Sequence, residues 1–164
     1  MSNTNIQAAY EATRKFNEIA GNLEDNSPER INFQLDLINE ELVETAAATG
    51  HEGCDCGQEA AAPNAIELLD GACDLFVTVA GLMQKLEAAG FNVEEALKRV
   101  CDNNMAKFPL AVELPSTCPE GSDVSLSSCG KHIIYKRNSD GKVTKPTNFV
   151  SVDLEGLAPE GYFA

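Results

Sequence analysis

The chain of 164 residues is long enough for one domain with a modest core and too short for two full domains. An apolar fraction of 43% argues against wholesale disorder, and because Trp is absent, Leu, Ala, Val and Ile must do most of the packing. A formal net charge of -14 argues against a nucleic-acid duplex as partner, because its phosphates would be repelled.

No stretch of the sequence approaches the roughly 20 apolar residues that a membrane span needs, and the N-terminus lacks the basic-then-apolar pattern of a signal peptide. We therefore expect a cytoplasmic location and no membrane partner. Two of the six cysteines, Cys73 and Cys101, fall inside helical patterns, so free thiols in a reducing compartment are expected.

The first two predicted helices lie before residue 50. Apolar residues recur at helical spacing from about residue 4 to residue 20, which predicts the first helix. The second helix is predicted to begin at Ser27-Pro28, with Ser as N-cap and Pro at the first helical position, and to end near Ala48.

Two further helices follow a segment without periodicity. The third is predicted to begin near Pro63 or Asn64 and to end near Gly90. It is apolar on more than one side, which favours a central position in a bundle. The fourth is predicted to begin after Asn92, where Glu95 completes a capping box, and to end before Pro109.

The C-terminal part of the chain has a different character. Lys131–Lys136 and Lys142–Thr144 flank an Asp140-Gly141 turn, which predicts a β-hairpin. The last ~20 residues are expected to form an extended tail that packs on its own or a neighbouring subunit. We therefore expect an all-α fold: a four-helix bundle over residues 1–110 and a C-terminal extension over residues 111–164 that carries the hairpin and the tail.

Carboxylates gather at helical spacing on the second and third predicted helices. Glu40, Glu41 and Glu44 fall within little more than one turn of the second helix. On the third helix, one face that borders the apolar stripe carries Glu67, Asp70 and Asp74. A solvated helix face is the usual explanation of one such cluster, whereas two clusters on consecutive helices are less often accidental.

Acids along a buried seam repel each other and lose hydration, which costs several kcal/mol per charge without compensation. Protonation through a raised pKa, or a bound hard cation, would relieve this cost. Mg²⁺ takes oxygen ligands and leaves positions for water and substrate phosphates, and helical bundles build such sites from facing helices. Spacing alone leaves the metal site and the solvated face both open.

The acidic residues also carry a family resemblance. Glu41-Leu42-Val43-Glu44 and Glu67-Leu68-Leu69-Asp70 form an ExxE…ExxD pattern, which Glu40 extends to EExxE. This pattern resembles the MazG-like, all-α NTP pyrophosphatases, which include phosphoribosyl-ATP pyrophosphohydrolases and dimeric dUTPases. The resemblance covers about residues 16–145. Phage-type members of the phosphoribosyl-ATP pyrophosphohydrolase-like group are similar through an Asp-x-x-x-Asp helix, a small-residue turn (Val79-Ala80-Gly81), Asn103–Lys107 and an Asp140-Gly141-Lys142 hairpin.

The resemblance implies a helical module that forms a homodimer or homotetramer, with Mg²⁺ or Mn²⁺ in an acidic cleft. Family members cleave the bond between the α- and β-phosphates of nucleoside triphosphates and release the monophosphate and pyrophosphate. By this resemblance the metal ligands are Glu41, Glu44, Glu67 and Asp70; Asp74 aligns alternatively with the final Asp, and either register stays open. Glu41 or Glu44 is expected to act as the general base.

Substrate contacts are less specific. The resemblance implies that Asn104 and Lys107 contact the sugar or the phosphates, and Asn17, Asn103 and Asn104 are candidates for reading a base edge. A solvated Lys107 that favours the helix dipole is an equally good interpretation. We expect a deoxynucleoside triphosphate as substrate and a role in nucleotide-pool control in a bacterium or a phage, in the host cytoplasm in the latter case.

Two features depart from the family pattern. The segment His51–Cys56 is an insertion, and residue 71 is Gly where many relatives have Glu beside the final Asp. A zinc site from His51, Cys54 and Cys56 with Cys118 or Cys129 is one hypothesis, and a loop with incidental thiols is the preferred one. The remaining alternatives to the main hypothesis are phosphoribosyl-ATP hydrolysis, dUTPase specificity on the same scaffold, and a non-enzymatic helical dimerisation or regulatory module.

Overall fold

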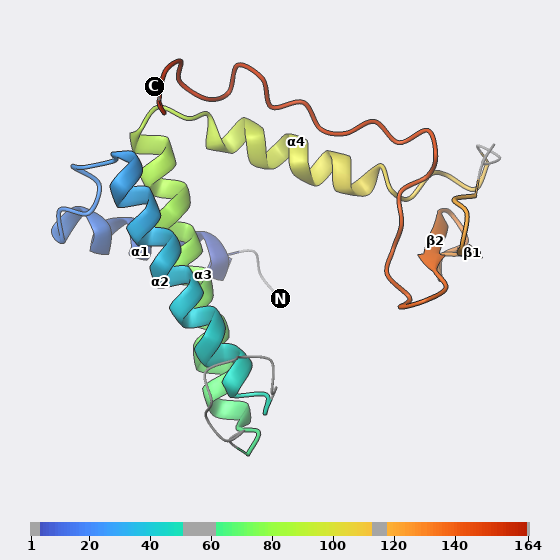
Figure 1. The fold of residues 1–164 in the computed structure, drawn as a ribbon, viewed down its shortest axis with the longest axis horizontal. Helices are drawn as coiled ribbons and strands as arrows, with labels where there is room; N and C mark the ends of the chain where they lie inside the picture. Colours follow the sequence, from blue (N-terminus) through green and yellow to red (C-terminus); the bar gives the residue numbers. More distant parts are fainter. Residues whose placement is uncertain (1–3, 51–61, 113–117, 164) are drawn as a thin grey trace. The chain divides into compact units, whose positions relative to one another are not determined.

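The structure is a computed structural model that describes residues 4–50, 62–112 and 118–163 (Figure 1). These ranges contain four helices and two strands in the order α1 (Thr4–Ile19), α2 (Pro28–Ala47), α3 (Ala65–Ala88), α4 (Val93–Met105), β1 (Ser122–Leu126) and β2 (Ile133–Arg137). The four predicted helices are confirmed, and the described chain is mostly helical with one short antiparallel sheet. None of the helices in these ranges has an apolar stretch long enough to cross a bilayer.

The chain divides into two compact units. The first consists of Met1–Val93 with Ala158–Ala164, and the second of Glu94–Leu157. The predicted boundary near residue 110 differs from this division, in which α4 groups with the C-terminal segment. Side chains of α4 explain the grouping: Arg99 donates to the carbonyl of Asp153 at 3.2 Å, and Asn103 to that of Val150 at 2.7 Å.

The starts of α2 and α3 use different local chemistry. Ser27 is the N-cap of α2 in an extended backbone conformation, but its hydroxyl caps none of the described amides. Its carbonyl accepts instead from the amides of Arg30 and Ile31, both at 3.0 Å, as Pro28 begins the helix. Asn64 caps α3 with its side chain, which accepts from the amides of Ile66 and Glu67.

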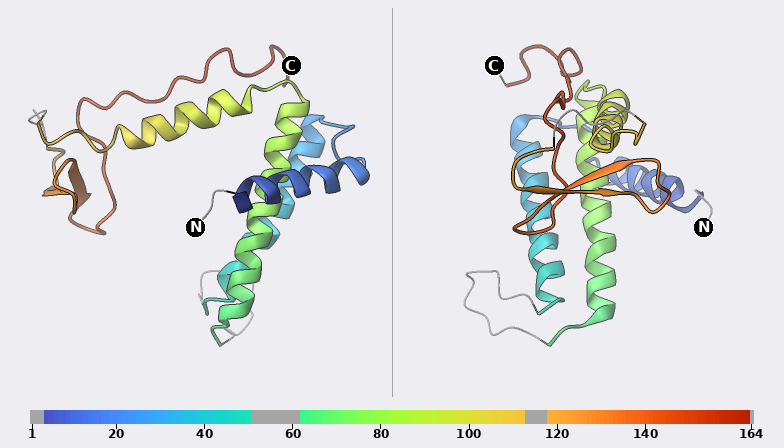
Figure 2. Two further views of the ribbon diagram at one scale, coloured as in Figure 1. Left: turned by 180° about the vertical axis from the view of Figure 1, so that it is seen from behind. Right: turned by 90° about the vertical axis from the view of Figure 1, so that its right-hand side faces the viewer.

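The helices α2 and α3 lie side by side and antiparallel in the first unit (Figure 2). Three contacts fix their register. The amide of Asn64 donates to the carbonyl of Ala48 at 2.9 Å, and Gln34 Nε2 donates to the carbonyl of Thr78 at 3.0 Å. Between these two hydrogen bonds, Gly71 of α3 lies directly against Thr45 of α2. A Gly in a helix interior costs about 1 kcal/mol relative to Ala, so this position needs a packing reason.

The helix α1 runs across α3 and not along it, as both views in Figure 2 show. The residues Val79-Ala80-Gly81, expected as a small-residue turn, lie inside α3, where Ala80 and Gly81 are buried. Small residues at this point allow close approach of the neighbouring helices. A Cβ added to Gly81 would lie 3.2 Å from Gln34 Nε2 on α2 and 3.5 Å from Asn17 Nδ2 on α1.

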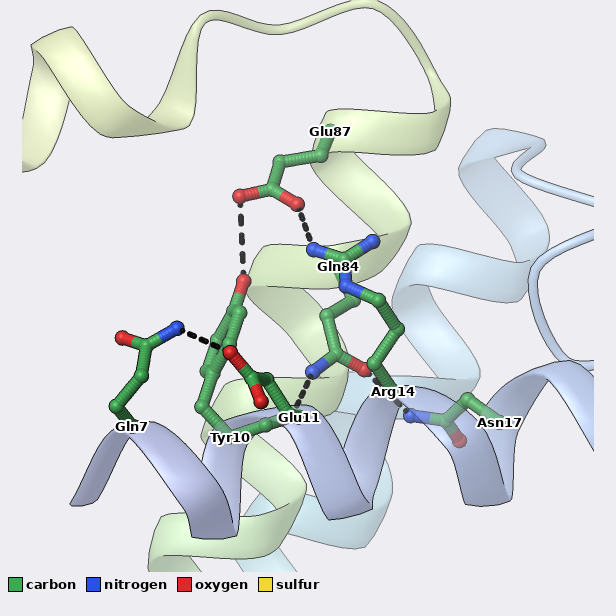
Figure 3. A network of polar contacts seen from close by, with 7 residues as sticks. All are labelled: Gln7, Tyr10, Glu11, Arg14, Asn17, Gln84 and Glu87. Atoms are coloured by element: carbon green, nitrogen blue, oxygen red, sulfur yellow. Dashed lines mark hydrogen bonds and ion pairs between the residues drawn. The ribbon is translucent and has the colours of Figure 1, made fainter. Parts of the chain in front are cut away.

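Polar groups occupy the crossing of α1 and α3 (Figure 3). Gln84 is fully buried; its Nε2 donates to the carbonyl of Tyr10 at 2.9 Å and its Oε1 accepts from Asn17 Nδ2 at 3.0 Å. Nearby, Glu87 accepts from the Tyr10 hydroxyl at 3.2 Å and forms an ion pair with Arg14. Because both polar atoms of Gln84 are paired, the network fixes where α1 crosses α3 without leaving an unsatisfied buried amide.

The β-hairpin of the second unit was predicted only in part. The predicted segment Lys131–Lys136 largely matches β2, but its antiparallel partner is β1, with Val124 opposite Tyr135. The segment Lys142–Thr144 pairs with β2 through an isolated bridge between Val143 and Lys136, with backbone hydrogen bonds from Arg137 to Lys142 and from Thr144 to Tyr135. The Asp140-Gly141 turn does form, with Gly141 at φ 70° and the amide of Lys142 donating to Asp140 Oδ1. The chain then reaches Pro146, which has no backbone N–H to donate to a neighbouring strand and so does not extend the pairing.

The C-terminal end of the chain returns to the first unit. The Tyr162 ring packs edge-on against Phe91, with centroids 5.0 Å apart, and its hydroxyl donates to the carbonyl of Asn26. Of the two predicted arrangements of the tail, its last described residues therefore pack on their own subunit. These contacts connect the segment before α2 with the segment that follows α3.

Candidate functional site

The predicted carboxylates lie on facing parts of one helix pair. Glu40, Glu41 and Glu44 belong to the C-terminal half of α2, and the N-terminal half of α3 carries Glu67, Asp70 and Asp74. Glu41 lies one turn before Thr45 on α2, and Asp74 one turn after Gly71 on α3. Since Thr45 and Gly71 are in contact and the helices are antiparallel, Glu41 and Asp74 lie at the same level of the pair.

The pKa of Glu41 reflects electrostatic repulsion by the neighbouring carboxylates. The pKa of the Glu41 carboxyl is raised above its ordinary value of 4.5, and burial is the largest cause. The next causes, from larger to smaller, are the negative charges of Asp74, Glu44, Glu40 and Asp70. The charge of Asp74 therefore acts on Glu41 more strongly than that of Asp70. Glu41 itself is half-buried, whereas both aspartates are exposed. We call Glu40, Glu41, Glu44, Asp70 and Asp74 the acidic patch.

Glu67 lies at one end of this region, in the first turn of α3. Its amide donates to the capping side chain of Asn64, and an acidic side chain here interacts favourably with the helix dipole. This dipole interaction is a sufficient structural reason for an acid at residue 67. Of the five predicted metal ligands, four belong to the acidic patch and Glu67 borders it.

The acidic patch suits a hard divalent cation by its donor chemistry, because every member supplies carboxylate oxygens, as Mg²⁺ and Mn²⁺ prefer. The carboxylates do not yet surround a common point. Within residues 4–50, 62–112 and 118–163, no three His, Cys, Asp or Glu side chains are grouped closely enough to hold a metal ion. The backbone thus brings the predicted ligands to one place, and rotation of their side chains would have to complete a ligand set.

The predicted substrate-binding residues lie in different places. Asn17 is buried in the crossing of α1 and α3, where Nδ2 donates to Gln84 and Oδ1 accepts from Asn22. The structure therefore gives its amide a structural role. Asn104 and Lys107 belong to the second unit, where Lys107 Nζ donates to Asn104 Oδ1 at 2.7 Å. Asn103 is engaged with the carbonyl of Val150.

The predicted zinc ligands are described only in part. His51, Cys54 and Cys56 lie outside the described residues. Cys118 precedes β1 and contacts the Ser122 carbonyl, whereas Cys129 follows β1 and contacts the Ser127 hydroxyl. The described cysteines are free thiols, as expected: Cys73, Cys101, Cys118 and Cys129.

Sequence reasoning missed buried polar residues of the first unit that lie away from the acidic patch. Gln34, Gln84 and Lys85 are polar residues of α2 and α3 that are buried. Their position within the apolar pattern was the available signal, since a polar residue there must find a buried partner. Thr45 gave no signal at all, because its importance comes from the glycine that it contacts on another helix.

The chain matches no protein-family model, no curated protein and no solved structure.

The raised pKa of Glu41 predicts a specific pH dependence of stability. In the folded chain Glu41 keeps its proton to a higher pH than in the unfolded chain. Its contribution to the free energy of unfolding is therefore fully present below about pH 4.5, the ordinary pKa, and is lost as the pH rises through the raised pKa of the folded chain. Glu41→Gln should therefore raise the melting temperature of the metal-free protein at about pH 7 and have little effect at about pH 3.5.

Thermal unfolding in EDTA checks this expectation, with Glu18→Gln on α1 as an exposed control outside the acidic patch. A Glu41→Gln protein that melts below the parent at neutral pH would show that the carboxylate stabilises the fold and would contradict the repulsion described above.

Proposed function

We propose that the protein is a metal-dependent nucleotide pyrophosphohydrolase that converts a nucleoside triphosphate, preferably a deoxynucleoside triphosphate, to the monophosphate and pyrophosphate. The observation that carries the proposal is the position of Glu41 and Asp74 at one level of the α2–α3 pair, with Glu44 and Asp70 beside them. The resemblance of the ExxE…ExxD pattern to MazG-like enzymes supports it. The proposal includes a MazG-like four-helix arrangement and a cytoplasmic location.

A cation is required by the charges involved. A nucleoside triphosphate carries up to about four negative charges and would be repelled by a bare acidic patch. In the proposal Glu41, Glu44, Asp70 and Asp74 hold Mg²⁺ or Mn²⁺, with Glu67 beside them. The bound ion supplies charge neutralisation at the phosphates and a water of lowered pKa.

Glu41 is the proposed general base. Its carboxyl lies at the level of Asp74 on the facing helix, where the cation and its water would be held, so it is placed to accept a proton from that water. Removal of a proton from water by Glu41 favours in-line attack at the α-phosphorus with pyrophosphate as leaving group. Glu44 is the alternative base, one turn along α2. Asn104 and Lys107 are proposed to contact the substrate, as the resemblance implies.

Turnover assays test the proposal directly. The purified chain is incubated with each canonical dNTP and NTP, with and without Mg²⁺, and the products are separated by ion-exchange chromatography. We expect monophosphate and pyrophosphate, formed only with the metal. Glu44→Ala should lower kcat at least about a hundredfold, the usual scale for loss of a group that acts in the transition state. Asp36→Asn, an exposed substitution earlier on α2, should leave kcat unchanged.

Other product patterns separate the alternatives. Diphosphate and phosphate as products would place the attack at another phosphorus and contradict the mechanism. Turnover of only phosphoribosyl-ATP or only dUTP would identify another specificity on the same scaffold. Absence of turnover, together with no rise in melting temperature on adding Mg²⁺, would favour a helical dimerisation or regulatory module.

We also propose that the chain forms a homodimer or homotetramer. Large apolar side chains on the α2–α3 pair are open to solvent in the first unit: Leu42 is 53% exposed, Ile66 76% and Leu69 64%. Apolar patches of this kind commonly mark protein interfaces. They lie on the helices that carry the acidic patch, so an interface there would also limit the access of water to it.

Sedimentation equilibrium checks the assembly, and a mass of two or four times that of one chain is expected. Leu69→Lys should shift the population towards the monomer, because a charge at an apolar interface loses its hydration. Leu97→Lys on α4, at a leucine that is 52% exposed, is the control outside the α2–α3 pair. A parent protein with the mass of one chain contradicts the proposed assembly.

A further inference from the structure

Gly71 lies at a close contact between α3 and Thr45 of α2. A Cβ built at this residue would be 2.5 Å from Thr45 Oγ1 and 3.2 Å from both Cα and Cβ of Thr45. Real Cβ atoms essentially never approach a neighbouring heavy atom within 3.0 Å. Rotation of the Thr45 side chain cannot remove the whole conflict, because one of the crowded atoms belongs to the backbone. A side chain at residue 71 therefore requires the Thr45 hydroxyl to move and the backbone of α2 to give by a few tenths of an ångström.

This contact lies inside the acidic patch. On α2, Thr45 follows Glu44 directly, and its hydroxyl donates to the carbonyl of Glu41 at 2.7 Å, one turn earlier. On α3, Gly71 follows Asp70 directly and precedes Asp74 by one turn. The distance between the two backbones at Thr45 and Gly71 thus limits how closely the carboxylates of α2 and those of α3 can approach.

We propose that Gly71 is a positioning residue whose missing side chain holds α2 and α3 close enough for carboxylates of both helices to share one divalent cation. The inference rests on the proposed metal-dependent function and adds a residue that influences metal binding without being a ligand. Gly71 contacts neither the cation nor the substrate in this arrangement and acts only through the spacing of the helices. The Thr45–Gly71 contact then limits how far apart the ligands of the two helices can lie once their side chains have rotated towards the cation.

Gly81 on the same helix provides a matched comparison. A Cβ there would meet Gln34 Nε2 at 3.2 Å and Asn17 Nδ2 at 3.5 Å. Both are ends of buried side chains with hydrogen bonds of their own, to the Thr78 carbonyl and to Gln84 Oε1, and neither belongs to the backbone. Gly81 lies ten residues from Gly71, or about 15 Å along the helix. Gly81→Ala therefore adds the same methyl group to α3, about 80° around the helix from Gly71 and far from the acidic patch, so the helix spacing at the patch should stay unchanged.

Binding of Mn²⁺ to the full-length chain tests the inference, with free Mn²⁺ measured by electron paramagnetic resonance and helix content checked by circular dichroism. Gly71→Ala should weaken Mn²⁺ binding about tenfold or more, the scale seen when groups behind metal ligands are changed, and Gly81→Ala should leave it unchanged. Thr45→Ala/Gly71→Ala removes the 2.5 Å contact and should recover part of the loss. The loss should be smaller for Ca²⁺, which accepts longer bonds and looser geometry.

The outcomes separate this inference from the proposed function. A folded Gly71→Ala protein that binds Mn²⁺ like the parent would overturn the positioning role while leaving the metal site intact, and so would an equal loss in Gly81→Ala. A parent that binds no Mn²⁺ would overturn the proposed metal site itself. If Gly71→Ala fails to fold, the double variant is compared with Thr45→Ala alone, and equal Mn²⁺ affinities of these two overturn the role of Gly71.

Discussion

The contact between Thr45 and Gly71 brings α2 and α3 so close that a methyl group does not fit between them. Two hydrogen bonds hold the same register on either side, one from Asn64 to the carbonyl of Ala48 and one from Gln34 to that of Thr78. Together these contacts set the register of the helix pair and form its frame, because sliding one helix along the other would break both hydrogen bonds. The carboxylates of α2 and α3 are consequently held together whatever their mutual repulsion.

This frame explains why an unfavourable arrangement of charges persists. Burial and four neighbouring carboxylates all disfavour the ionised form of Glu41, and its raised pKa records that cost. Carboxyl groups with raised pKa values occur at functional sites and also in structural charge networks, so the raised pKa is consistent with the proposed cation site and does not by itself identify it. The polar crossing around Gln84 differs in this respect, because both polar atoms of that buried amide are satisfied within the chain.

Much of this arrangement could be predicted from the sequence. Apolar periodicity and Pro28 predict α2 and α3 closely, and the spacing of Glu41, Glu44, Asp70 and Asp74 predicts that their faces meet. The strand β1 could not be predicted with the same rules, because alternation of Val124 and Leu126 is hidden in a stretch rich in Ser and Pro. The closeness of Gly71 to Thr45 depends on helix register, which tertiary contacts set and local sequence does not.

A double-mutant cycle of Glu41→Gln and Asp74→Asn, with unfolding followed in urea, tests most directly whether these facing carboxylates form a cation site. In EDTA the two carboxylates should repel, so that the interaction energy obtained from the cycle destabilises the fold. With saturating Mg²⁺ the interaction energy should change sign, since a shared cation makes each carboxylate depend on the other. A repulsive interaction energy of the same size with and without Mg²⁺ would contradict the shared site.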